Sequence, residues 1–208
     1  ACPGLFIAGR AITQTGGHGD ATMVNGVRLR VPNAELPENL VDGPEGARKT
    51  TREILRAGAD QIKIMTSGGV LSPNDEPAAT GMTPDEIAAV VYEAHAAHKT
   101  VMSHAQANLG ILNAVLAGVE SIEHGIYLDD EAIEMMLAHG TYLVPTLTAP
   151  MGVLEAVDLD TFVRVTSTDR SVTHALPKET TRNEQPLAQS LFVTRIALDV
   201  IGSVLPTG

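Results

Sequence analysis

The chain has too little cysteine, aromatic content and positive charge for several classes of protein. One cysteine in 208 residues excludes an intrachain disulfide and a cysteine-rich zinc module. With 14 basic against 25 acidic side chains the net charge is −11, so a basic surface for nucleic acid or an anionic membrane is missing. No apolar run reaches the roughly 18 residues that a membrane-spanning helix needs. No signal peptide is recognisable, and we expect a cytoplasmic protein.

Aromatic residues make up only 3% of the chain and tryptophan is absent, while apolar residues reach 44%. The core must therefore be built from aliphatic side chains and methionine, as in many α/β proteins.

One pattern recurs along the chain: an amphipathic helix, a small-residue turn and a short strand rich in β-branched residues. Alternation of this kind predicts parallel βαβ units. Since a closed eight-stranded barrel needs about 250 residues, we expect an α/β fold, a partial TIM-type (β/α)8 barrel with about five parallel strands and helical crossovers. The predicted helices cover residues 44–56, 84–98, 108–116 and 129–138, and the predicted strands cover 5–13, 61–65, 100–104, 119–124 and 141–147.

The pattern fades after residue 150. We therefore expect a partial barrel over residues 1–150 and a divergent, unassigned tail over 151–208. Two long loops, 14–42 and 67–82, follow predicted strands, and loops of that length inside a compact domain are usually functional.

Three side chains from successive predicted strands carry the chemical argument. Lys63 lies within one strand, and His104 and His124 close the next two. The carboxyl ends of parallel barrel strands converge on one site, so these residues should lie close together. Imidazole is a good zinc ligand, whereas a lysine ammonium has no lone pair and binds metal only once carbamylated. A free charge at Lys63, between apolar neighbours in a central strand, would be costly.

The remaining histidines are less informative. His18 lies in a glycine-rich loop on the same side of the predicted barrel, where it could contact substrate. His95, His98 and His139 lie on or just after helix C-terminal turns, where an imidazolium suits the helix dipole, and we interpret them as structural.

Four stretches of the segment 5–150 together resemble the metal-dependent amidohydrolases related to imidazolonepropionase and prolidase-like dipeptidases. The stretches are Ala-Gly-Arg-Ala-Ile-Thr-Gln-Thr-Gly-Gly-His-Gly-Asp at 8–20, Gly-Ala-Asp-Gln-Ile-Lys-Ile-Met-Thr-Ser-Gly-Gly-Val-Leu-Ser-Pro at 58–73, Ser-His-Ala at 103–105 and Ser-Ile-Glu-His-Gly at 121–125.

The resemblance implies a (β/α)8 barrel holding two divalent metals, usually zinc, of which this chain would supply strands three to seven. Lys63 would be the carbamylated bridge, and His104 and His124 would hold the second metal. A metal-bound hydroxide would then attack the carbonyl carbon of a small amide or dipeptide-like substrate, whose C–N bond would break. Tyr127 falls where related enzymes recognise the substrate, and a contact to a carboxylate or carbonyl is expected there.

The chain departs from the family pattern at two places. The family has a His-x-His pair on its first strand and an aspartate after its eighth, and neither is found in this sequence. The resemblance therefore implies a chain truncated before its third barrel strand, inactive or impaired on its own.

Two other interpretations remain open. Ile62-Lys63-Ile64 followed by Thr66 also resembles the lysine strand of deoxyribose-phosphate aldolases, in which a lysine of depressed pKa forms a Schiff base. A degenerate, inert barrel fragment is the other alternative. Its open sheet edges would favour association, so a homo-oligomer is possible.

Overall fold

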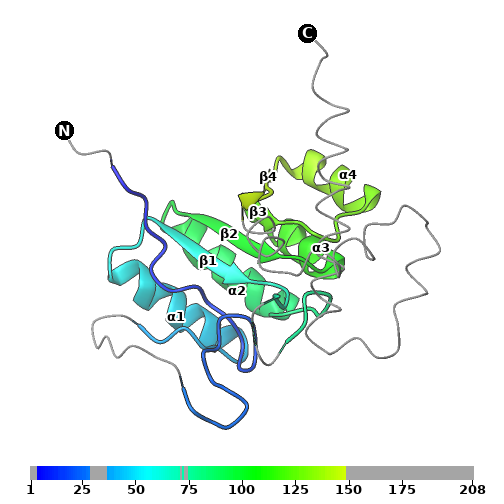
Figure 1. Cartoon of the computed structure of the whole chain (residues 1–208). Coiled ribbons are helices and arrows are strands. Elements are labelled where there is room, and N and C mark those ends of the chain that lie inside the picture. The colour runs from blue at the N-terminus through cyan, green and yellow to red at the C-terminus, as the bar shows by residue number, and fades with distance from the viewer. Residues whose placement is uncertain (1–3, 29–36, 71, 73–74, 149–208) are drawn as a thin grey trace. The chain divides into compact units, whose positions relative to one another are not determined.

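The computed structural model describes residues 4–28, 37–70, 72 and 75–148 (Figure 1). Its elements alternate strictly between helix and strand after the first 43 residues. In chain order they are α1 (Pro44–Arg56), β1 (Gln61–Met65), α2 (Pro84–Ala96), β2 (Thr100–Ala105), α3 (Asn108–Ala117), β3 (Ser121–His124), α4 (Asp130–His139) and β4 (Tyr142–Val144).

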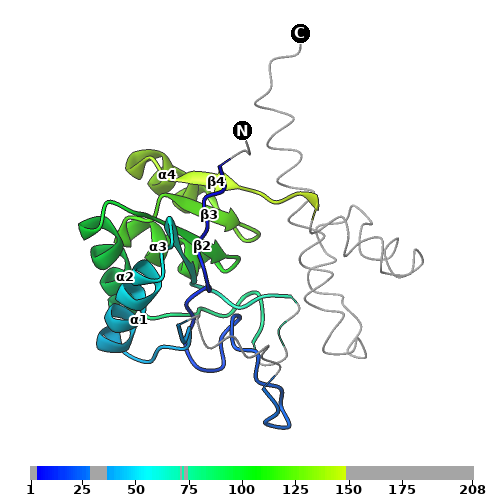
Figure 2. The same cartoon turned by 90° about the vertical axis from the view of Figure 1, so that its left-hand side faces the viewer.

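The four strands form one parallel sheet in the order β1-β2-β3-β4, so α2, α3 and α4 are crossovers between neighbouring strands, while α1 precedes β1. Figure 2 shows the helices together on one face of this sheet. The arrangement is that of consecutive units of a TIM-type barrel, which confirms the predicted fold class.

The predicted count of five strands needs a correction at its N-terminal member. The backbone of residues 5–13 bonds to β1 and the residue before it through two residues. Ile7 O accepts the N–H groups of Asp60 at 2.8 Å and Gln61 at 3.4 Å, and Ile12 donates to Lys63 O at 2.8 Å and accepts from Met65 N–H at 3.0 Å. Gly9, with φ +67°, lies between these contacts and interrupts the extended backbone. The expected fifth strand is therefore a parallel bridge between Ile12 and Ile64.

Alternation along the strands separates a core face from an open face. Ile62 and Ile64 of β1 are fully buried and join Val101, Ile122 and the helices in one apolar cluster. Lys63 and Met65 have the opposite parity, so they lie on the other face, which in a barrel is the interior.

The helix ends follow the sequence rules that predicted them. Thr83 and Glu86 form a capping box at the start of α2. Gly118 and Gly140 end α3 and α4 in the left-handed conformation, with φ +96° and +69°.

The chain divides into two compact units, residues 1–144 and 145–208. The first contains every element described above. The predicted boundary at residue 150 and the tail 151–208 lie outside the described residues, so that division stays a prediction. In the described part of the chain, no helix is both long and apolar enough to cross a membrane.

Candidate active site

Three histidines meet at the C-terminal ends of the strands. The rings of His104 and His124 lie edge to face with centroids 4.8 Å apart, and the ring of His18 stacks on that of His104 at 4.2 Å. His104 is the penultimate residue of β2 and His124 is the last residue of β3, whereas His18 reaches the site from the loop after the N-terminal bridge. Histidines spread over more than 100 residues of sequence are thus brought to one place.

Lys63 lies on the open face of the sheet, on the same side as His104. Its backbone partner in β2 is Met102, and His104 follows two residues later on the same face. Burial lowers the pKa of Lys63 to about 8, against a smaller opposing effect of Glu123. The lysine charge in turn contributes to lowering the pKa of all three histidines, so it lies within electrostatic range of each ring.

His124 reaches the cluster through an unusual backbone conformation. It has the parity of Ile122, whose side chain packs into the core, so a regular strand would turn His124 toward the helices. Instead its φ is +75°, a left-handed value that is uncommon for a residue with a Cβ. Gly125 follows with φ +62°, and this turn directs the imidazole to the ring of His104. Backbone strain of this kind gathers at functional sites.

Hydrogen bonding defines the tautomer of His104. Its Nε2–H donates to Gly68 O at 2.8 Å, because a carbonyl oxygen can only accept. The lone pair of the neutral ring is then on Nδ1. Burial, followed by the neighbouring His18, lowers the pKa of His104 to about 3, and burial followed by Lys63 lowers that of His124 to about 4. Near neutral pH both rings are therefore uncharged, and each has one ring nitrogen that carries a lone pair.

The nitrogen and oxygen atoms gathered here are of the chemical types that bind divalent cations. Ligating histidines typically donate their second ring N–H to a carbonyl, as His104 does. Buried Gln106, two residues further on, has an Oε1 with no hydrogen-bond partner among the described residues. Those residues contain no group of three or more His, Cys, Asp or Glu arranged to hold a metal ion. Lys63, a predicted ligand, could join the two histidines only once carbamylated, because an ammonium has no lone pair.

Tyr127 belongs to a neighbouring cavity of about 600 Å³. Its backbone N–H donates to Gln106 O at 2.9 Å, which places it beside the end of β2. Burial, followed by Glu76, raises the pKa of its phenol. The lining comes from the loops after β1, β2 and β3 and from the first turn of α3, and it carries no charged side chain: Ala78, Ala79, Thr80, Ala107, Asn108, Leu109 and Tyr127.

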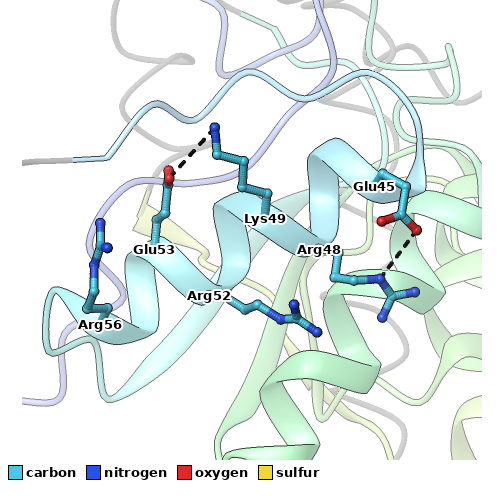
Figure 3. Close-up of a pocket in the computed structure, with 6 residues that line it drawn as sticks. All are labelled: Glu45, Arg48, Lys49, Arg52, Glu53 and Arg56. Atoms are coloured by element: carbon cyan, nitrogen blue, oxygen red, sulfur yellow. Dashed lines mark ion pairs between the residues drawn. The ribbon is translucent and has the colours of Figure 1, made fainter.

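A second hollow, of about 260 Å³, lies on helix α1 (Figure 3). Most of its charges are paired with one another or with α2: Arg48 and Arg52 both bond to Glu93, at 2.7 Å each, and Lys49 lies 3.9 Å from Glu53. Because all its lining residues belong to α1, it is separate from the strand ends, and we assign its ion pairs to helix packing.

The sequence did not single out two residues that support His18. Ser72 Oγ lies 2.8 Å from His18 Nδ1, and Ser72 also bonds to Asp75. The available signal was the length of loop 67–82. The sequence analysis did not single out Glu123 either. Glu123 lies opposite His104 in the register of β2 and β3, and its charge raises the pKa of His124 against the lowering effect of Lys63.

Fold and site together define a unit of a parallel α/β barrel that gathers its histidines at the carboxyl ends of the strands. The model of the amidohydrolase family matches residues 5–181, and the chain belongs to that family.

The chain is 34% identical to ochratoxinase from Aspergillus niger over 154 residues, which is 69% of this chain and 32% of ochratoxinase. Among solved structures it resembles a prolidase complexed with N-methylphosphonate-L-proline, with 36% identity, a TM-score of 0.71 and coverage of 98% of this chain and 46% of the prolidase. A Xaa-Pro dipeptidase with methionine in its active site gives 32% identity and a TM-score of 0.70, covering 96% and 44% of the two chains. The chain thus spans about a third of the curated relative and less than half of these structures.

Proposed function

We propose that this chain carries part of the active site of a metal-dependent hydrolase that cleaves C–N bonds in small amide or dipeptide-like substrates. Lys63, as a carbamate, and His104 and His124 would hold a divalent metal, for which zinc fits the ligand types. The contact between the His104 and His124 rings, at 4.8 Å on the face that carries Lys63, is the observation on which the proposal rests.

The environment of Lys63 supports carbamylation. Carbon dioxide reacts only with the neutral amine, and burial has lowered the pKa of Lys63 to about 8 from an ordinary value of 10.5. A much larger fraction of this amine is therefore free near neutral pH than for an exposed lysine. Carbamylation would also replace a buried cation by an anion beside neutral imidazoles, which favours a metal cation.

A metal bound there would lower the pKa of a coordinated water and polarise the scissile carbonyl. The residues of this chain would bind the substrate and orient it. Tyr127 borders the uncharged cavity, and we propose that its phenol contacts the substrate carboxylate or carbonyl. His18, stacked on His104, would face the same substrate. The names of the relatives support the substrate class, because prolidase and Xaa-Pro dipeptidase denote enzymes acting on dipeptides.

Metal binding by the full chain tests the proposal without requiring turnover. Purified protein is incubated with zinc, with and without bicarbonate, and bound metal and melting temperature are measured. We expect zinc to raise the melting temperature, more so with bicarbonate, and expect His104→Asn, His124→Asn and Lys63→Met each to weaken binding at least tenfold. His139→Asn, on an exposed helix end, is the matched control and should bind as the wild type does.

Borohydride trapping separates the Schiff-base alternative. Reduction in the presence of an aldehyde or ketone should leave Lys63 unmodified, while 13C-labelled bicarbonate should give a carbamate signal that Lys63→Met lacks. Trapping of a carbonyl compound on Lys63 would favour the aldolase. Absence of both zinc binding and the carbamate signal would favour the inert fragment.

A further inference from the structure

The loop after β1 packs against the side chain of His18 and forms a hydrogen bond with it. Gly69 lies directly against the imidazole, since a Cβ on Gly69 would overlap its Cε1, Nδ1 and Nε2 atoms. Ser72 Oγ lies 2.8 Å from His18 Nδ1. Ser72 Oγ also bonds to Asp75 Oδ1, which accepts in addition the Gly69 N–H at 3.3 Å. A chain of polar contacts therefore runs from the Asp75 carboxylate to one nitrogen of the His18 ring.

The direction of these hydrogen bonds follows from the proton inventory. A serine hydroxyl has one proton, and both of its recorded acceptors, Asp75 Oδ1 and, at 3.4 Å, Gly69 O, can only accept. The bond between Ser72 and His18 must then be donated by His18 Nδ1–H. In a neutral imidazole this leaves the lone pair on Nε2. His18 and His104 thus have opposite tautomers, because His104 donates from Nε2 to Gly68 O.

We propose that Ser72 and Asp75 are positioning residues that hold His18 as its Nδ1–H tautomer, so that Nε2 is left as a hydrogen-bond acceptor. The acceptor role rests on the proposed function, and it selects substrates that bring an N–H or O–H donor to this side of the site. The tautomer itself does not depend on it. Burial raises the pKa of Asp75 to about 6, and the carboxylate form that the chain of bonds requires predominates above that pH.

Ring-nitrogen NMR of the full, metal-free chain tests the tautomer directly. Histidine is labelled with 15N, and the pH is kept well above the pKa of Asp75. His18→Gln identifies the His18 signals by their loss. We expect the wild type to show the Nδ1–H pattern at His18, and Asp75→Asn to convert it to Nε2–H or to a mixture, since an asparagine amide can donate to Ser72. Asp85→Asn, which changes an exposed carboxylate on α2, should leave the pattern unchanged.

A pair of serine variants keeps the test decisive where Asp75→Asn fails to fold. Ser72→Ala removes the relay and should release the tautomer, while Ser72→Thr retains a hydroxyl and should restore it. An Nε2–H pattern in the wild type, or an Nδ1–H pattern that survives both Ser72→Ala and Asp75→Asn, would overturn the proposal. Because the spectra need neither metal nor substrate, failure of zinc binding would count against the proposed function alone.

Discussion

At the scale of single residues, the site depends on side chains held neutral by burial. Exposed imidazole titrates near 6.5, whereas His104 and His124 have their pKa lowered to about 3 and about 4, by burial before any other cause. A neutral imidazole has the lone pair that a metal requires. The burial that keeps the proposed ligands neutral therefore also makes the metal-free protein sensitive to acid.

The sign of that acid sensitivity follows from proton linkage. Between pH 6.5 and the lowered pKa values, the unfolded chain binds more protons than the folded one, so the free energy of unfolding falls as the pH drops through this window. Urea unfolding of the metal-free protein at several pH values should show this fall. His104→Gln should make it shallower, and His139→Gln should not. A flat wild-type profile would contradict the argument.

Gly69 should tolerate no side chain, because its position beside His18 leaves no space for a Cβ. We expect Gly69→Ala to displace the imidazole and to cost about 1–3 kcal/mol of stability, as overpacking does. Unfolding measurements give the cost, and the His18 ring signals report the displacement. Gly140→Ala, where a Cβ would meet nothing within 4 Å, should strain the backbone but leave those signals unchanged.

At the scale of the elements, the loop that supports the site is anchored by the start of α2. Thr83 Oγ1 accepts the Glu86 N–H, and Glu86 Oε2 accepts the Thr83 N–H at 2.8 Å. Glu86 Oε1 also accepts the N–H of Gly43, at the start of α1, at 2.6 Å. One buried carboxylate therefore ties together the beginnings of two helices.

Removing this cap should have a measurable and reversible effect. Thr83→Ala should lower the free energy of unfolding by about 1 kcal/mol, the usual cost of losing an N-cap. Thr83→Ser keeps the hydroxyl and should recover most of the loss. Denaturant unfolding of the three proteins checks the prediction, and equal stabilities for the alanine and serine variants would show that the hydroxyl contributes nothing.

At the scale of the whole molecule, the sheet has an edge that favours association. β4 is the last strand in the described sheet, and Tyr142, Leu143 and Val144 are 75%, 37% and 40% exposed. Within the described ranges no strand pairs with its outer side. Unpaired strand edges with apolar side chains promote edge-to-edge contacts.

We therefore expect this chain to self-associate as its concentration rises, which sedimentation velocity would detect. Val144→Lys should weaken the association, since a charged side chain at a strand edge opposes pairing. Leu137→Lys, on an exposed position of α4, is the matched control for a general loss of apolar surface. If both variants act equally, the edge of β4 is not the contact.

The local elements could be predicted from sequence because their causes are local. Helix α1 begins and ends where the sequence predicted, at residues 44 and 56, and the other helices differ by one or two residues. Periodicity, a capping box and glycine stops lie within a few residues of the boundaries they set. The N-terminal strand was predicted too long, because whether an extended segment pairs depends on partners about 50 residues away.

The sequence by itself determined the family, the alternating units and the placement of His104 at a strand end, because residue order and spacing carry that information. Only the tertiary structure decided how the His124 ring reaches His104 and which loop residues join them. In a regular strand the side chain of His124 would point toward the core, but the left-handed backbone at this residue turns the ring to the other face. The loops hold His18, Ser72 and Asp75. Contacts between loops join segments that are distant in sequence, so they produce no periodic pattern from which they could be predicted.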